Sequence, residues 1–258
     1  MELAQIAERP IEMIHIHRDL GVLEIVLDRP SKRNALNGEL YEQAARALID
    51  VNTEGDTAAV LIRAEGEYFC AGQDVSQLAA GGPRLPIEDR PVFRFMRSVL
   101  HCERPIVAAV QGPAIGIGAT MLMLFDLVYV ADDAWLSFPF CSLGLSPEFG
   151  ASVLLPRFVG SGAATRALLL GEKLGAQEIV GSGWAVAGGS AAATLASAKS
   201  AAARLAGASK PAIQATRRLM RQEDRASLEE VLMREFEVFD ALRNTPEHLA
   251  VMSAWRAR

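Results

Sequence analysis

The sequence has few cysteines: its 258 residues contain only Cys70, Cys102 and Cys141. Three is an odd number in a long chain, which excludes a disulfide scaffold and indicates reduced thiols in a cytoplasmic protein. Half of the residues are hydrophobic and 22% are charged, so intrinsic disorder is excluded too. The 21 glycines and 12 prolines follow no period, which excludes collagen. The composition is that of a globular chain with enough apolar residues for a large core.

The sequence also has little excess charge of either sign. The net charge is −5 and no block of like charge stands out, so a nucleic-acid-binding surface is not expected. The first ten residues contain acids and no apolar stretch of signal-peptide length. The longest uncharged run, Ile106 to Phe125, has about the length of a membrane span, but Gly112-Pro113, Gly116 and Gly118 interrupt it. We therefore expect a buried strand, turn and helix there, and no membrane partner.

Strands and helices alternate through the first half of the chain, as the spacing of its apolar residues indicates. This alternation predicts an α/β fold with parallel strand pairing, followed by a mainly helical region from Ser146 onward. The predicted strands are Ile14 to Leu27 (two strands around Asp19-Leu20-Gly21), Ala58 to Arg63, Ile106 to Val110 and Leu127 to Ala131. The predicted helices are Asn37 to Val51, a short one after Gly72, Arg90 to Cys102, Gly116 to Phe125, Ala191 to Ala208, Pro211 to Gln222, Ala226 to Leu242 and Pro246 to Trp255, with a loop at Ala80 to Pro86.

Several familiar catalytic motifs are missing: the sequence has no P-loop, HExxH, CxxC or GxSxG. The glycine-rich segment Gly112 to Gly118 is not GxGxxG, which disfavours a dinucleotide site. His15 and His17 alternate along a strand, and solvent exposure is favoured over a metal pair because no third ligand is in view. His101 and His248 are expected at the surface.

Two turns of small residues follow predicted core strands. One is Gly112 to Gly118, which leads into a helix, and the other is Phe69 to Asp74. Small residues let a ligand approach the backbone, and a helix start leaves N–H groups unpaired. The two turns could therefore each offer an N–H donor to one oxygen that develops negative charge. Tight packing alone would explain the first turn equally well.

Glu148 lies in the segment Leu145 to Gly150 and has two possible roles. Ser146 is a good helix N-cap, with Pro147 at the first helical position and an acid at the second, so a capping role is the simpler interpretation. The alternative is a general base, because neighbouring Phe140 and Phe149 would desolvate the carboxylate and raise its pKa.

At these three places the sequence resembles the crotonase (enoyl-CoA hydratase/isomerase) superfamily. The resemblance covers nearly the whole chain, and its motifs run in order through residues 28–37 (DRPSKRNALN), 69–74 (FCAGQD), 109–116 (AVQGPAIG) and 125–127 (FDL). It implies an α/β fold of the crotonase type, a spiral of strand–strand–helix units with a C-terminal helical trimerisation region. We accordingly expect an α/β core with the acyl-CoA site over residues 1–190 and the helical region over residues 191–258.

The resemblance also implies a reaction. The backbone N–H groups of Gln73 and Ile117 would hold the thioester oxygen of an acyl-CoA, and Glu148 would be the single base of an enoyl-CoA isomerase. Hydratases place glutamates at the positions of Thr120 and Phe140, and this chain has neither. Residues 138–148 (FPFCSLGLSPE) closely resemble the peroxisomal-type Δ3,Δ2-enoyl-CoA isomerases. Two alternatives stay open: a hydratase or another crotonase reaction, and an acyl-CoA-binding module without catalysis.

The resemblance implies no cofactor, since coenzyme A enters as part of the substrate, and no metal. It implies a homotrimer or a dimer of trimers, which the apolar positions of the helical tail would support if they need a partner surface (Leu228, Val231, Leu232, Phe236, Phe239 and Leu242). Trp255 is expected to help cover the ligand. The residues expected to bind the acyl-CoA are Lys32, Arg33, Ala35, Ala71, Gly72, Asp74, Gly116, Phe140 and Phe239.

Overall fold

The structure is a computed structural model that describes residues 14–78, 85–221 and 225–256. Its strands are β1 (Ile14–Asp19), β2 (Val22–Leu27), β3 (Ala59–Ala64), β4 (Ile106–Val110), β5 (Ala114–Ile115), β6 (Leu127–Ala131), β7 (Trp135–Ser137), β8 (Leu174–Gly175) and β9 (Val186–Gly189). Its α-helices are α1 (Gly38–Thr53), α2 (Val75–Leu78), α3 (Pro91–His101), α4 (Ile117–Thr120), α5 (Ala151–Leu170), α6 (Ala176–Gly181), α7 (Ala191–Ala206), α8 (Lys210–Arg221), α9 (Arg225–Leu242) and α10 (Pro246–Arg256). The 3-10 helices are η1 (Pro30–Lys32), η2 (Ile87–Asp89), η3 (Met121–Leu124) and η4 (Cys141–Leu143).

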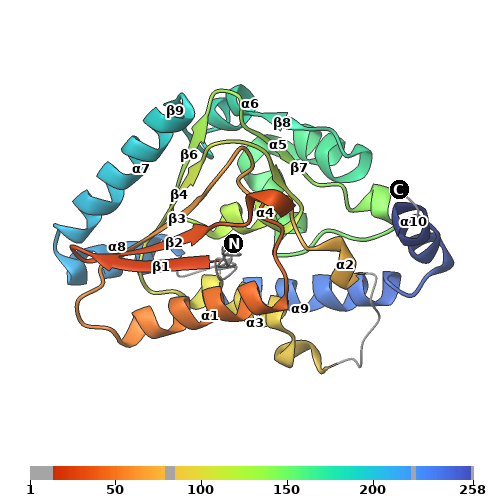
Figure 1. The fold of residues 1–258 in the computed structure, drawn as a ribbon. Coiled ribbons are helices and arrows are strands. Elements are labelled where there is room, and N and C mark those ends of the chain that lie inside the picture. The colour runs from red at the N-terminus through yellow and green to blue at the C-terminus, as the bar shows by residue number, and fades with distance from the viewer. Residues whose placement is uncertain (1–13, 79–84, 222–224, 257–258) are drawn as a thin grey trace, which may run out of the picture.

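Two sheets organise the fold (Figure 1). The larger has six strands in the order β1-β2-β3-β4-β6-β9, in which β1 and β2 are antiparallel and every other pair is parallel. The smaller has the order β5-β7-β8 and stands next to it. The chain thus returns four times to the same sheet as a parallel strand, at β3, β4, β6 and β9. This is the crotonase-type α/β fold that the resemblance implies.

Helices cover both faces of the larger sheet, and this explains the composition of its central strand. Alternate residues of β4, such as Ile106 and Ala108, face the main core, while Val107 and Ala109 face α7. A strand covered on both faces is apolar throughout, which is why the uncharged run around β4 has the length and hydrophobicity of a membrane span. The alanines of α7 that touch the sheet are small, so this helix lies close to it. Helix α7 begins just after the predicted boundary at residue 190 and packs on the sheet.

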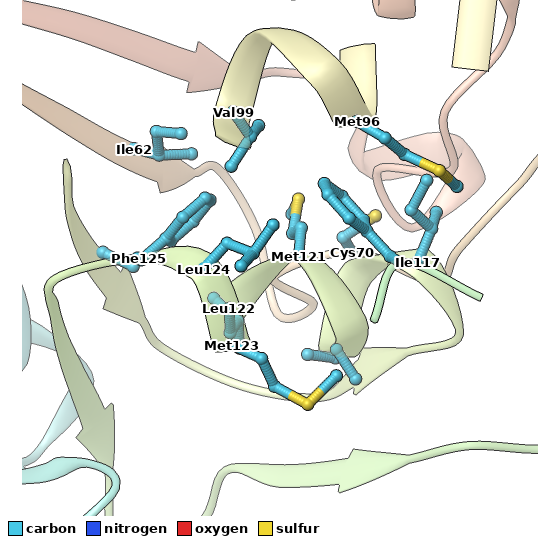
Figure 2. Packing of buried hydrophobic residues seen from close by; sticks show 14 of the residues in the cluster. Ile62, Cys70, Met96, Val99, Ile117, Met121, Leu122, Met123, Leu124 and Phe125 are labelled. Carbon is cyan, nitrogen blue, oxygen red and sulfur yellow. The ribbon is translucent and has the colours of Figure 1, made fainter. Parts of the chain in front are cut away.

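The main core lies between the sheet, α3 and the helical segment that follows β5. In Figure 2, Met96 and Val99 of α3 lie above this segment, with Ile117 beside Met96 and Leu124 further along. All four side chains are buried. The predicted single helix from Gly116 to Phe125 is in fact α4 followed by the tighter η3, and every residue of both is buried.

The region after Ser146 is less purely helical than predicted, because β8 joins the small sheet and β9 forms the last strand of the large one. The other predicted helices and strands are confirmed to within a few residues, and α7 is a single helix. The predicted loop at 80–86 lies mostly outside the described residues.

Helix α5 is, within the described part of the chain, the one helix long and apolar enough by length and composition to cross a membrane. Only 22% of its apolar window is buried. Gly160 has non-helical backbone angles (φ 79°, ψ 156°) and divides the helix in two. One such helix is weak grounds for a membrane span. Its exposed Leu169 and Leu170 are apolar surface that the single chain does not cover.

The apolar positions of α9 do not support the argument that they need a partner subunit. Leu228, Val231, Leu232, Phe236 and Phe239 are all buried within the chain. All of them except Val231 belong to the main core, and Phe236 meets Phe93 of α3 edge to face with ring centres 5.4 Å apart. The inference from amphipathicity to a trimer is therefore wrong in its premise, because a helix's apolar face can be satisfied by its own domain.

Candidate active site

A cavity of about 400 Å³ lies where the small-residue turns, the start of α3 and the C-terminal helices meet. Most of its wall is apolar, and Glu148 is the one acidic residue among the described residues that line it. The residues that line it are Ala71, Gly72, Gln73, Val75, Arg90, Val92, Met96, Ile115, Gly116, Ile117, Pro139, Phe140, Ser142, Leu143, Leu145, Glu148, Phe236, Phe239, Arg243 and Met252. An apolar cavity with a few polar groups is the usual form of a small-molecule site.

The two small-residue turns are joined to each other by backbone hydrogen bonds. The N–H of Ile115 donates to the carbonyl of Cys70 at 2.9 Å, and the N–H of Cys70 donates to the carbonyl of Pro113 at 3.3 Å. Gln73 and Ile117 follow these paired residues, and both line the cavity. Neither backbone N–H has a hydrogen-bond partner among the described residues. The turns therefore place two unpaired backbone N–H donors at the same cavity, where one oxygen atom of a ligand could accept a hydrogen bond from each.

Glycine is required at both turns. Gly72 has φ +93°, and a Cβ atom there would lie 2.8 Å from the carbonyl oxygen of Ile115. Gly116 has φ +54° and ψ −124°, a conformation that is essentially restricted to glycine. The close approach of the two turns depends on the missing side chain at Gly72.

Glu148 is 5% exposed and forms part of the cavity wall beside α4. The hydroxyl of Thr120 donates to its Oε1 at 2.7 Å, while Oε2 is buried without a hydrogen-bond partner among the described residues. Burial raises the pKa of Glu148 to about 8, the Thr120 hydrogen bond opposes this, and the nearby charge of Glu235 adds to it. A carboxylate with a raised pKa and a free oxygen is suited to accept a proton from a ligand.

The capping interpretation of this segment is wrong. Helix α5 begins at Ala151 with Gly150 as its N-cap, so Ser146 is not a cap and Glu148 lies before the helix. The Ser146 hydroxyl is buried and has no hydrogen-bond partner among the described residues. Two successive residues with positive φ, Phe149 and Gly150, delay the helix. The local pattern of a good cap was outweighed by packing of Phe149 into the core, where it is fully buried.

The cavity contains some of the predicted binding residues and not others. Ala71, Gly72, Gly116, Phe140 and Phe239 line it. The remaining four, Lys32, Arg33, Ala35 and Asp74, do not.

Two of these four are exposed and two are held by Arg29. Lys32 and Arg33 are exposed, and the guanidinium of Arg33 lies over the ring of Tyr68. Arg29 donates to the Asp74 carboxylate at 2.7 Å and to the carbonyl of Ala35 at 3.1 Å. Asp74 also accepts from the N–H of Ser76 at 3.0 Å, the hydrogen bond of an N-cap at the start of α2. A ligand that fills the cavity would meet Lys32 and Arg33 only if it extended beyond the cavity.

Sequence reasoning missed several lining residues, including Arg90, Arg243 and Met252. Arg90 forms a two-pronged ion pair with Asp240 of α9, at 2.8 and 3.2 Å, so it joins the two helices beside the cavity. The charge of Arg90 is visible in the sequence, but its partner lies 150 residues away. No local pattern could have placed it at the site.

His248 is not at the surface as expected. It is 1% exposed, and its Nδ1 donates to the carbonyl of Leu143 at 2.7 Å, which fastens α10 to η4. This contact brings Met252 to the cavity. His101 is partly exposed and bonded to Glu229 at 3.2 Å. The side chain of Trp255 lies outside the described residues.

His15 and His17 do stack on one face of β1, with ring centres 6.1 Å apart. His15 bonds to Asp28 at 2.8 Å. In the described part of the chain, no group of three or more histidine, cysteine or acidic side chains is placed to hold a metal ion.

The paired turns above an α/β core, with one buried carboxylate facing them, define a crotonase-type site. The family model for enoyl-CoA hydratase/isomerase matches residues 17–255. The chain belongs to the enoyl-CoA hydratase/isomerase family.

Individual relatives of the chain have different names. Enoyl-CoA delta isomerase 2 of Rattus norvegicus is 36% identical over 162 residues, 61% of this chain and 41% of the relative. The chain thus spans less than half the length of that protein. The probable enoyl-CoA hydratase echA6 of Mycobacterium leprae is 36% identical over 88% of this chain and 90% of its own length. The solved structure of Pseudomonas aeruginosa OdaA has a TM-score of 0.91 at 36% identity, covering 96% of this chain and 100% of that one.

Proposed function

We propose that this protein is an enoyl-CoA isomerase that moves the double bond of a 3-enoyl-CoA to the 2-position. One observation carries the proposal: among the described residues Glu148 is the single carboxylate that lines the cavity, it is buried with one oxygen unpaired, and the same cavity is lined by Gln73 and Ile117, whose backbone N–H groups are also unpaired. Moving one proton between two carbons of the same substrate needs one group that can accept and return it. The relative named Enoyl-CoA delta isomerase 2 is consistent with this chemistry.

The proposed reaction uses the groups in the following order. The thioester oxygen accepts hydrogen bonds from the N–H groups of Gln73 and Ile117, and Glu148 removes a proton from C2. The electron pair of that C–H bond is delocalised into a dienolate whose charge the two donors stabilise. The neutral Glu148 then gives the proton to C4, and the double bond becomes conjugated with the thioester. No cofactor is needed beyond the coenzyme A of the substrate.

The hydratase alternative is favoured by the name of the M. leprae relative, which matches most of the chain. Addition of water across a double bond is usually performed by two carboxylates in different protonation states. At the two positions where hydratases carry glutamates, this chain has Thr120, bonded to Glu148, and the buried Phe140. No second acid lines the cavity in the described part of the chain, so isomerisation fits the groups better.

An activity panel tests the proposal against both alternatives. Incubation with 3-enoyl-CoA thioesters should produce the absorbance of the conjugated 2-enoyl thioester, and crotonyl-CoA should be consumed slowly or not at all. Rapid loss of crotonyl-CoA absorbance would identify a hydratase. Acyl-CoA binding without turnover of either substrate would identify a binding module.

The pH profile of the reaction should reflect the environment of Glu148. Because the base must be deprotonated, kcat/KM should rise with pH through about 8, the pKa to which burial raises this group. Thr120→Val removes the hydrogen bond that lowers the pKa of Glu148 and should shift the profile to higher pH. Thr194→Val, at a buried threonine of α7 whose hydroxyl donates to the Ser190 carbonyl at 2.9 Å, is the matched control. An unchanged midpoint in Thr120→Val would contradict this assignment.

We also propose that the protein is a homotrimer or a dimer of trimers in the cytoplasm. Large apolar side chains are left exposed at the end of α5 (Leu169 and Leu170) and on α8 (Leu219 and Met220), which suits an interface with another copy. The three cysteines form no disulfide among the described residues, which suits a reducing compartment. Sedimentation at micromolar concentration should give the mass of three or six chains of 27.7 kDa. A stable monomer would contradict the assembly.

A further inference from the structure

Glu235 is a buried acid outside the cavity wall, and the proposed mechanism does not use it. It lies on α9 and is 6% exposed. Its carboxylate accepts two backbone hydrogen bonds, from the N–H of Gly150 at 2.6 Å and from the N–H of Ser152 at 2.9 Å. These are the residues that follow Glu148 in the chain. Helix α9, 85 residues away in sequence, is therefore hydrogen-bonded to the segment that carries the candidate base Glu148.

The backbone of the segment that Glu235 binds is strained at Phe149 and Gly150. Phe149 has φ +60° and Gly150 has φ +81°, and a left-handed conformation is unfavourable for phenylalanine. The Phe149 ring is buried and meets Phe95 edge to face at 6.0 Å. Such a conformation persists only where the surroundings enforce it. The core holds the ring of Phe149, and Glu235 holds the backbone that follows.

Glu235 also acts as an N-cap for helix α5. Helix α5 begins after Gly150, which has no side chain to cap it, so the N–H groups at the helix start need another acceptor. The Glu235 carboxylate accepts two of them, and a negative charge is favourable at this end of a helix. Removing it would leave two buried or partly buried donors unpaired at the turn next to Glu148.

We propose that Glu235 is a positioning residue for the isomerase reaction: by holding the N–H groups of Gly150 and Ser152, it fixes the turn that aims the Glu148 carboxylate into the cavity. The inference rests on the proposed function. Helix α9 then contributes to the reaction through the backbone of this turn, in addition to the cavity wall that Phe236 and Phe239 supply.

The groups around Glu148 and Glu235 determine how the pKa of Glu148 should respond to a change at Glu235. Glu148 is faced by the Thr120 hydroxyl from α4, by Tyr41 from α1 and by Glu235 from α9. Burial raises the pKa of Glu235 as well, and its backbone hydrogen bonds and Arg234 oppose that shift. Since the charge of Glu235 raises the pKa of Glu148, its neutralisation should lower that pKa.

Three variants test the inference with 3-enoyl-CoA as substrate. Glu235→Ala should lower kcat by about 10- to 100-fold, the cost of a small misplacement of a reacting group, with KM within about threefold of the parent. Glu235→Gln keeps the size and one acceptor oxygen, so it should recover part of kcat while shifting the midpoint of the kcat/KM profile to lower pH. Glu237→Gln removes an exposed charge from the same helix and should change neither.

The outcomes separate positioning from stability alone. A role in stability alone predicts earlier melting of Glu235→Ala and Glu235→Gln with the parent kcat and pH midpoint, and this result would overturn the inference. If Glu235→Ala does not fold, the pH profile of Glu235→Gln decides. If the parent protein isomerises no 3-enoyl-CoA, the proposed function fails. Glu235 is then judged by carbon-13 NMR titration of the Glu148 carboxyl, assigned with Glu148→Gln: a midpoint lowered by Glu235→Gln supports the contact, and an unmoved midpoint refutes it.

Discussion

Glu148→Gln should abolish isomerisation of 3-enoyl-CoA while leaving acyl-CoA binding nearly unchanged. The amide has the size of the carboxyl group and can keep the hydrogen bond with Thr120, but it cannot accept the C2 proton. Loss of a general base costs about 10²–10⁴-fold in rate, and the cost is larger where the same group must also return the proton. The backbone donors of Gln73 and Ile117 remain, so a calorimetric titration with acyl-CoA should give a dissociation constant close to that of the parent.

The same variant should be more stable than the parent at neutral pH. Burial raises the pKa of Glu148 to about 8, well above its value of 4.5 in the absence of the fold. Stability that depends on the protonated form is fully present below pH 4.5 and declines as pH rises toward 8. Glutamine imitates the protonated form, so Glu148→Gln should melt several degrees higher at pH 8 and at the same temperature as the parent near pH 4.

Melting and turnover should be measured on one preparation of Glu148→Gln. A variant that isomerises at the parent rate would remove Glu148 as the base and the isomerase assignment with it. A variant that melts earlier at pH 8 would show that its carboxylate stabilises the fold, as a helix cap would, and would contradict the arrangement around Thr120.

The parts of the site that depend on adjacent residues could be predicted from the sequence. The two turns combine glycine with a preceding core strand, and the strand β4 is visible as a short apolar run. In each case the local backbone requirement decides the structure, because few residues other than glycine tolerate the φ values of Gly72 and Gly116. The resemblance then assigned chemistry to the donors.

The parts that depend on distant packing could not be predicted. Ser146-Pro147-Glu148 has the pattern of a helix start, yet the helix begins at Ala151 because Phe149 is buried in the core and Glu235 supplies the cap. His248 carries no local sign of burial, and its partner is a carbonyl 105 residues away. The apolar face of α9 indicates that something covers it, but not that its own chain does.

Gly72→Ala should lower kcat/KM for 3-enoyl-CoA by about 10²–10³-fold, the typical effect of losing one oxyanion donor. The added Cβ would lie 2.8 Å from the carbonyl oxygen of Ile115, and that oxygen is backbone, so the turns must separate. Gln73 follows directly, and its N–H would move away from the N–H of Ile117. Because the donors act on the charge that develops in the transition state, the loss should appear mainly in kcat.

Left-handed strain has to be separated from this close approach, and Gly171→Ala does so. Gly171 ends α5 with φ +69°, and no atom lies within 4 Å of a Cβ placed there. An alanine costs about 1–2 kcal/mol in that conformation at either position. Both variants should therefore melt earlier than the parent, and only Gly72→Ala should lose turnover. If Gly72→Ala keeps the parent kcat, the two N–H groups do not form the oxyanion site, and the negative charge of the intermediate must be stabilised elsewhere in the cavity.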